Sequence, residues 1–441
     1  MKNHYRWMPL ALLAFSIVAA ASDPLATQIK NPDEKLRQEA AERLGKTGGR
    51  SAVPVLAAAL RDPSEKVRRK VIIALDRLRY PETLEPLRQA TQDPTPELAR
   101  LAILALVNHS TGRELSLGVT GRLKTLGSRV KRGFEPDDTR IDSDVRVDPL
   151  TIKALENVLK RKRGWEAERA AAWSLGVLLA RAAIPTLVDT AHSPDPDLAR
   201  EAMNSLTKIL DPSAGPPLVD LLDSPYEDVR KDAAVTVGVL RTQEAVEPLG
   251  DLYRRERSRK VRAKALEGLA FIGDETSATI FEEALGSRND AFRIAAAEGF
   301  ARLGDAQYAD ELRHAVANEK DGKARLAMAF ALAAMGDSDY VLDLVQQLGS
   351  AFRRNIARAY LIELSRDADA RFQLYRHLNY HAPDVRKNLC QILMYHGDSD
   401  TIKALEYLTR DKNNNVAIEA LRATRVIRAR EIAKGQTRQG G

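Results

Sequence analysis

Three histidines and three tyrosines gather within a short stretch near the C-terminal end of the chain. The stretch LYRHLNYHAPDVRKNLCQILMYHGD contains Tyr375, His377, Tyr380, His381, Tyr395 and His396. His377 and His381 are four residues apart, a spacing that aligns two imidazoles for a metal ion when both lie on a helix. Ala382 and Pro383 follow at once, so we expect His381 to lie beyond the helix end. We therefore expect turn residues without a metal, and take as candidate protein contacts Tyr375, His377, Tyr380, His381 and His396.

A second set of charged residues lies between His109 and Pro149. It contains a basic run and an acidic pair: Arg129, Lys131, Arg132, Asp137 and Asp138. A calcium loop would need aspartates at alternate positions, then a glycine and a distal glutamate, and that pattern is missing. We take these five residues as candidate contacts for a protein, because insertions in repeat arrays tend to lie on the binding face. A tolerated surface insertion is the alternative interpretation.

The sequence contains no pattern of a known catalytic site. There is no glycine-rich phosphate loop, no nucleophile elbow and no cysteine–histidine ligand spacing. We therefore predict a protein that is not an enzyme and that holds no metal or cofactor. Cys390 is the only cysteine, and it falls at a position where other copies of the repeat described below have alanine. We expect it to be a buried core thiol.

A repeated unit must position these residues, and an arginine marks each copy. The arginine stands in the frame apolar-Arg-x-x-apolar, and adjacent matching copies are 31 or 32 residues apart: Arg37, Arg68, Arg230, Arg262, Arg293, Arg325 and Arg386. About twelve units are present, the last one incomplete. We expect the arginine to bond carbonyl groups or acids of the next unit and so to form a ladder. A basic stripe that binds a ligand is the alternative.

Each unit is predicted to be a pair of helices. A turn residue and often a proline open the first helix, with the turn residue as its cap, as in Asp62-Pro63, Asp93-Pro94 and Ser224-Pro225. Apolar residues then recur at helical spacing. Glycine is predicted to end the first helix in a left-handed conformation, at Gly45, Gly273, Gly304, Gly336 and Gly397. One pair cannot cover its own apolar face, so the stacked pairs must form an all-α solenoid.

The consensus VRxxAAxxLGxLGDxxAVPxL, spread over these copies, resembles the HEAT-like repeat of the bilin-lyase type. The resemblance implies an α-solenoid of about twelve two-helix HEAT-like repeats over residues 22–109 and 150–431. An insertion loop at 110–149 interrupts the third repeat, and residues 432–441 are expected to form a disordered tail. By default the resemblance implies protein–protein binding on the concave face of the array.

The N-terminal segment is typical of a secretory signal peptide. Lys2 and Arg6 precede an apolar run from Met8 to Ala21, and Ala19 and Ala21 frame an A-x-A-like cleavage site. We predict that residues 1–21 are removed and that the mature protein is periplasmic or secreted in a bacterium, without stable insertion in a membrane. An uncleaved membrane anchor is the alternative.

The charge distribution does not favour a nucleic-acid partner. The chain carries a net charge of +7, but Lys2 and Arg6 belong to the signal segment. The last thirty residues hold seven basic and two acidic side chains, so the body between them is close to neutral. We therefore predict a protein partner and no nucleic acid. Two other functions stay open by analogy: a lyase-like or cofactor-handling protein, and a nucleic-acid-binding protein like the HEAT-like glycosylases. Histidine–glutamate pairs, with which HEAT-type hydroxylases hold iron, are absent.

Overall fold

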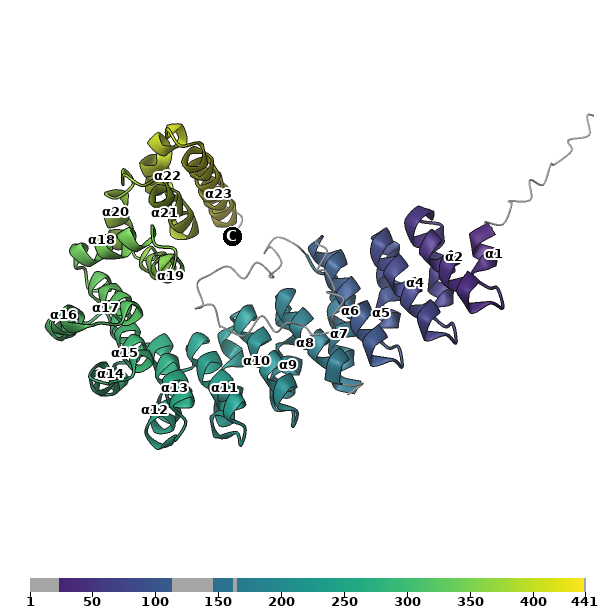
Figure 1. Cartoon of the computed structure of the whole chain (residues 1–441), viewed down its shortest axis with the longest axis horizontal. Coiled ribbons are helices and arrows are strands. Elements are labelled where there is room, and N and C mark those ends of the chain that lie inside the picture. Colours follow the sequence, from purple (N-terminus) through teal and green to yellow (C-terminus); the bar gives the residue numbers. More distant parts are fainter. Residues whose placement is uncertain (1–23, 113–145, 162–164, 440–441) are drawn as a thin grey trace, which may run out of the picture. The chain divides into compact units, whose positions relative to one another are not determined.

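The computed structural model describes residues 24–112, 146–161 and 165–439. Every regular element within these residues is a helix, and the helices follow one another in stacked pairs (Figure 1). The predicted all-α solenoid is confirmed. The chain divides into two compact units, Met1–His109 and Ser110–Gly441, here called unit 1 and unit 2. The predicted signal peptide, residues 1–21, lies outside the described residues.

Unit 1 contains two complete helix pairs and the start of a third. Its helices are α1 (Pro24–Gln28), α2 (Glu34–Thr47), α3 (Ala52–Ala59), α4 (Glu65–Leu78), α5 (Leu84–Ala90) and α6 (Pro96–Thr111). The apolar positions of the repeat form the core of the unit, where Leu44, Leu56, Val71 and Leu75 are buried. Each pair therefore covers the apolar face of the next, as the repeat pattern predicts.

Unit 2 is built from the same kind of helix pair. Its longer, first helices are α8 (Trp165–Val177), α10 (Pro196–Ile209), α11 (Glu227–Val239), α13 (Arg259–Ile272), α15 (Asp290–Leu303), α17 (Gly322–Ala334), α19 (Arg354–Leu364), α21 (Pro383–His396) and α23 (Asn414–Gln439). The second helices are α7 (Pro149–Arg161), α9 (Ile184–Ala191), η4 (Pro216–Asp223), α12 (Val246–Arg255), α14 (Ala278–Leu285), α16 (Ala309–Asn318), α18 (Ser338–Gln347), α20 (Ala368–Tyr375) and α22 (Ser399–Leu405) with η8 (Glu406–Arg410). One-turn 3-10 helices precede several of them.

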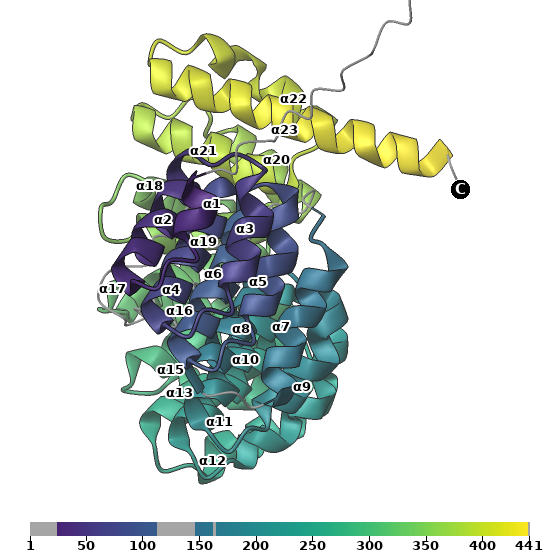
Figure 2. The same ribbon diagram turned by 90° about the vertical axis from the view of Figure 1, so that its right-hand side faces the viewer.

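The C-terminal segment differs from the prediction. Helix α23 continues to Gln439 and so includes most of residues 432–441, for which we expected a disordered tail. A helix is favoured here because AREIAK consists mainly of strong helix formers. Figure 2 shows the C-terminal half of α23 extending beyond α21 and α22.

Glycine ends first helices at some of the predicted positions but not at all of them. Gly273 and Gly304 cap α13 and α15 with φ angles of 69° and 66°, in the left-handed region as expected. Gly45 instead lies inside α2, where an added Cβ would come within 2.7 Å of the Ala74 Cα in α4. This glycine therefore permits a close approach of two helices and does not end one. Gly397 caps α21 in an extended conformation.

Asp62 and Ser224, which we expected to cap first helices, do not cap them, because Ser64 caps α4 and Tyr226 precedes α11 without a side-chain cap bond. Asp62 lies two residues before Ser64, which is the residue that caps α4. The Asp62 carboxylate accepts a hydrogen bond from the Ser64 backbone N–H at 2.8 Å and binds Arg37 of the preceding repeat. The turn residue thus connects two repeats because a carboxylate can accept from a backbone amide and a guanidinium together.

The array bends within unit 2 at α17. In Figure 1 the first helices α13, α15 and α17 lie on the inner side of the bend, and α12, α14 and α16 lie on the outer side. Every residue from Leu326 to Ala333 in α17 is buried. A helix that is apolar all round must be covered on all sides, and side chains of α15 and α19 meet across it, as described next.

Candidate functional site

The predicted arginine ladder is present at most of the expected positions, and Arg293 shows its geometry; Arg325, which we also expected to take part, is exposed and forms no such contact. The Arg293 Nε and Nη2 donate to Glu319 at 2.6 and 2.9 Å, and Nη1 donates to the Ser287 carbonyl at 2.9 Å. Glu319 also accepts from the Asp321 backbone N–H at 2.7 Å. Hydrogen bonds from Arg293 therefore hold the pKa of Glu319 below its usual range. The same arrangement joins Arg37 to Asp62, Arg68 to Asp93, Arg230 to Glu256 and Arg386 to Asp411.

Arg262 departs from the ladder. Its Nε donates to the Tyr253 carbonyl at 2.9 Å, and its guanidinium lies 4.8 Å from the centre of the Tyr253 ring and 5.2 Å from that of Phe292. Cation–π contacts replace the carboxylate at this repeat. Because the ladder arginines are engaged with the next repeat or with aromatic rings, they stabilise the stack and offer little to a ligand.

At the bend, two contacts join α15 directly to α19, although the repeat that begins with α17 lies between them. Arg302 of α15 donates from Nε and Nη2 to Glu363 of α19 at 2.8 and 3.0 Å. The Tyr360 hydroxyl of α19 donates to Glu298 of α15 at 2.6 Å, while its ring stacks on Phe330 of α17 at 4.5 Å. Burial lowers the pKa of Arg302, but Glu363 and Glu298 outweigh this and raise it above its ordinary value. We call these contacts the bend clamp.

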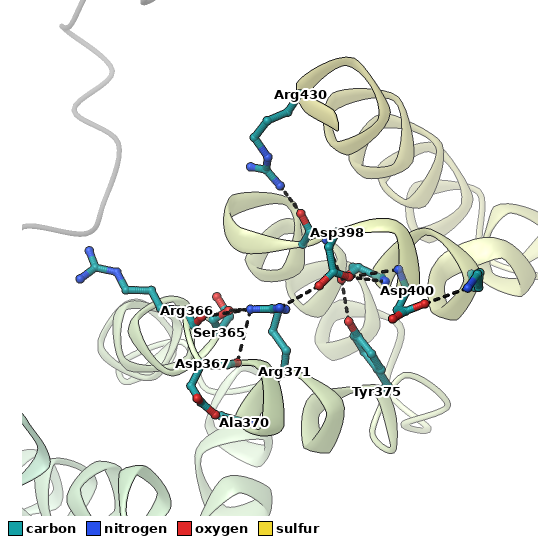
Figure 3. A network of polar contacts seen from close by, with 12 residues as sticks. Ser365, Arg366, Asp367, Ala370, Arg371, Tyr375, Asp398, Asp400 and Arg430 are labelled. Carbon is teal, nitrogen blue, oxygen red and sulfur yellow. Dashed lines mark hydrogen bonds and ion pairs between the residues drawn. The ribbon is translucent and has the colours of Figure 1, made fainter. Parts of the chain in front are cut away.

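A polar network joins the helices beyond the bend (Figure 3). Arg371 of α20 donates to the Ser365 carbonyl at the end of α19 and to Asp398 before α22, both at 2.8 Å. Asp398 caps α22 through the backbone N–H groups of Asp400 and Thr401, at 3.0 and 3.1 Å.

Helix α23 joins the same network. Arg430 donates to the carbonyls of Met394, at 3.2 Å, and of Tyr395 and Gly397 at the end of α21. The network therefore ties the ends of α19, α21 and α22 to arginines of α20 and α23.

Positive charge gathers beside this network, on the inner side of the bend. Arg366 is exposed, and its side chain points away from the contacts drawn in Figure 3. Partial burial, together with the charges of Arg241 and Arg302, lowers the pKa of Arg366, although Glu363 acts in the opposite direction. Burial and the charges of Arg366, Arg430 and Arg371 lower the pKa of His396 to about 4. His396 is therefore uncharged at neutral pH, and we call Arg241, Arg366 and Arg430 the inner basic cluster.

The residues predicted as contacts near the C-terminus do not form one site. Tyr375 is half-buried and bonds the Thr401 hydroxyl at 2.6 Å, so it holds two repeats together. His377 follows α20 and is half-buried, and burial with Arg376 lowers its pKa. The rings of Tyr380 and His381 lie 4.4 Å apart, before α21 begins.

His381 and His396 lie at opposite ends of α21. This helix has 14 residues, so the two imidazoles are separated by about 20 Å along its axis. Within the described residues no group of three or more histidine, cysteine, aspartate or glutamate side chains could hold a metal ion. The other five predicted contacts, Arg129, Lys131, Arg132, Asp137 and Asp138, lie outside the described residues.

Cys390 fulfils its prediction as a core thiol. It is fully buried in α21, and burial raises its pKa to about 12. Sequence reasoning missed Arg302, Glu363 and Arg366, because no pattern pairs residues two repeats apart. One signal was present: α17 has no charged side chain from Leu326 to its end at Ala334, which indicates a helix covered on every side.

The comparisons with known proteins concern the repeat. A family model of HEAT repeats matches residues 22–107, 152–238, 223–298 and 246–333, which together exceed half of the chain. No curated protein matches the chain. A crystal structure of an engineered protein is similar over 92% of this chain and 98% of its own, with 19% identity and a TM-score of 0.34. The X-ray structure of YibA from Escherichia coli is similar over 69% of this chain and 98% of its own, with 14% identity and a TM-score of 0.40.

The described helices are too short or too polar to include a candidate membrane span. Stacked helix pairs, an arginine ladder between neighbouring repeats and the match of the family model agree with one another. The chain belongs to the HEAT-repeat family.

Proposed function

We propose that the protein is an exported HEAT-repeat scaffold, which binds another protein at or outside the bacterial envelope through the concave face of its array and the segment 110–149. HEAT repeats commonly mediate interaction between proteins. Within the described residues, the proposed contact surface is the inner side of unit 2 between α11 and α23. We propose that the partner carries an acidic segment, because positive charge lies on this side of unit 2.

The inner basic cluster is the observation that carries the proposal. Arg302 is bound to Glu363 and Arg371 to Asp398, so these two charges are largely balanced. Arg241 and Arg366 are exposed and bring further positive charge to the same region. Arginine at the centre of a protein interface contributes strongly when a carboxylate binds it in two-bonded geometry. An acidic segment of a partner would therefore be attracted to this region of unit 2.

Nucleic acid is the rival ligand for such a cluster. Binding along a nucleic-acid backbone needs many phosphate contacts in a row, and it weakens steeply as salt is added. The ladder arginines, which repeat along the array, are engaged with carboxylates of the next repeat. The regularly repeated arginines therefore do not form a continuous basic track, a distribution that fits a short acidic peptide better than a long phosphate chain.

Export is supported by the sequence of residues 1–21 alone. Its basic start, apolar run and small residues have the order of a secretory signal. Cell fractionation and N-terminal sequencing of the mature chain test this part. A chain that begins near residue 22 and is found outside the cytoplasm supports it, and an intact N-terminus in the cytoplasm contradicts it.

Crosslinking in the native cell, followed by mass spectrometry, tests the binding function. Three chains are compared with the natural one: a variant lacking residues 111–148, Arg366→Glu with Arg241→Glu, and the exposed control Arg288→Glu. We expect one envelope protein to be captured by the natural chain and the control, and lost from the double variant. Equal capture by all chains would contradict the role of the inner basic cluster. If the natural chain retains duplex DNA and the double variant does not, nucleic acid is favoured as the ligand instead.

A further inference from the structure

One side of α23 carries exposed apolar side chains that no described element covers. Ile418 is 63% exposed, Leu421 42% and Ile432 59%. The opposite side of α23 is fully buried against α21 and α22, at Val416, Ala420, Ala423 and Ile427. Large exposed apolar residues are rarely gathered on one helix of a protein that binds nothing there.

These side chains recur with the spacing of a helix-pairing seam. Positions 418, 421, 425, 428 and 432 follow the alternation of three and four residues that defines a coiled-coil contact. Ile418 and Leu421 lie at one end and Ile432 at the other, while Arg425 and Arg428 lie between them. We call these five residues the α23 stripe.

The stripe has positive charge and no acid. The only acids of α23 are Glu419 and Glu431, and both are half-buried. Helical geometry places both of them about 100° or more from the centre of the stripe. Glu419 accepts a hydrogen bond from Gln391 of α21 at 3.1 Å, on the packed side of the helix. A ligand for the stripe must therefore bring its own carboxylates together with apolar side chains.

We propose that the α23 stripe binds an acidic amphipathic helix of another protein. Apolar residues of that helix pack on Ile418, Leu421 and Ile432, and its carboxylates lie opposite Arg425 and Arg428. Two-bonded contacts between arginine and a carboxylate give such a seam a register and an orientation. The proposal concerns a different surface from the inner basic cluster and stands without it.

The arrangement of the stripe disfavours two other occupants. A second copy of α23 paired in antiparallel fashion would place Leu421 beside Ile432 and Arg425 beside Arg428, and like charges in contact repel. A lipid surface suits a helix whose basic residues flank an apolar face. Here Arg425 and Arg428 occupy the middle of the face, so burying Ile418 and Ile432 in lipid would carry both guanidinium groups with them.

Fluorescence anisotropy with a synthetic peptide tests the proposal on the mature full-length chain. The peptide has three heptads, with leucine at the outer seam positions and glutamate at the two central ones. We expect it to bind the natural chain, and Arg425→Glu with Arg428→Glu to lower its affinity at least tenfold. A second peptide with lysine at the two central positions should bind that double variant more tightly than the natural chain. Arg288→Glu is the matched control and should change neither affinity.

Binding of the lysine peptide to the double variant distinguishes a charge-specific contact from a folding defect, because a misfolded chain would bind neither peptide. Equal binding of both peptides to all chains would overturn the proposal. The proposal would also be overturned if the chain binds phosphatidylglycerol vesicles and not the acidic peptide, and if Leu421→Glu abolishes the binding of the vesicles. Light scattering addresses the second copy: a dimer that Leu421→Glu separates into monomers would overturn the proposal, and a mass independent of this substitution supports it.

Discussion

Arg302 and Glu363 form a two-bonded ion pair although the whole helix α17 lies between the helices that carry them. Most other ion pairs between repeats join neighbours, as Arg37 and Asp62 do. Side chains of α15 and α19 can meet only where the array is bent, so this pair both requires the bend and stabilises it. The inner basic cluster lies on the same side of unit 2, which makes its geometry depend on the clamp.

Glu363→Gln should destabilise unit 2 strongly. The side chains of Arg302 and Glu363 are only 9% and 11% exposed, and removing the Glu363 charge takes the two-bonded carboxylate away from a buried guanidinium. Such a change lowers the free energy of unfolding by about 3–5 kcal/mol. Urea unfolding followed by circular dichroism measures this loss. Lys403→Ala breaks an exposed ion pair with Asp400 and should leave the free energy of unfolding almost unchanged; equal losses would contradict the clamp.

Arg293→Lys should weaken the contact between two repeats although it keeps the charge. A lysine ammonium cannot reproduce the two parallel bonds to Glu319 together with the bond to the Ser287 carbonyl. We expect a loss of about 1–2 kcal/mol in the free energy of unfolding. Hydrogen exchange of α15 and α17 should become faster at the same time. Arg288→Lys serves as the control at an exposed position, and an equally small effect of both substitutions would speak against a ladder that stabilises the stack.

His396 should make the protein less stable as the pH falls from about 6.5 toward 4. Burial and three arginines lower its pKa to about 4 in the folded state, so the unfolded chain binds more protons in this range. The free energy of unfolding then rises with pH across the same window. Because the side chain is half-buried, screening by solvent limits the effect to on the order of 1 kcal/mol. His396→Gln should flatten this part of the pH profile.

His192 should show the opposite behaviour and is the internal comparison. Burial lowers its pKa, but hydrogen bonds to the Val188 carbonyl at 2.9 Å and to Asp220 at 3.0 Å raise it overall. Its contribution to stability is present below pH 6.5 and is lost as the pH rises through the folded-state value. NMR titration of the two imidazoles measures both groups in one sample. A pKa of His396 above that of His192 would show that the arginines do not act on His396.

Gly45→Ala should destabilise unit 1 by forcing two helices apart. The new Cβ would lie 2.6 Å from the Ala74 Cβ and 2.7 Å from its Cα, and backbone atoms cannot move aside as a flexible side chain can. Overpacking of this kind costs about 1–3 kcal/mol in the free energy of unfolding. Gly286→Ala is the control, because its nearest neighbour would be 3.7 Å away and its backbone is helical. Thermal unfolding of both variants should separate them clearly; a neutral Gly45→Ala would contradict the close approach.

The sequence by itself determined the repeat and its local chemistry. An arginine every 31 or 32 residues, within an apolar frame, predicted helix pairs, their stacking and the arginine ladder. Each of these depends on residues within one repeat or at the boundary with the next. Cys390 was predicted as a core thiol for the same reason, since the position is apolar in every copy. Local spacing did not decide between turn and helix at Gly45, because a glycine that ends a helix and one that admits a neighbour look alike in a sequence.

The tertiary structure decided where the array bends and which side chains the bend brings together. Small rotations between successive repeats add up along a solenoid, and no single repeat encodes their sum. Arg302 therefore meets Glu363, and Arg366 lies within the electrostatic field of Arg241, although 61 and 125 residues separate the members of these pairs. His381 and His396, which the sequence places only fifteen residues apart, are kept at opposite ends of one helix. The rise of a helix separates residues that are close in the sequence, as it does His381 and His396. The curvature of the stack brings residues that are far apart in the sequence into contact, as it does Arg302 and Glu363.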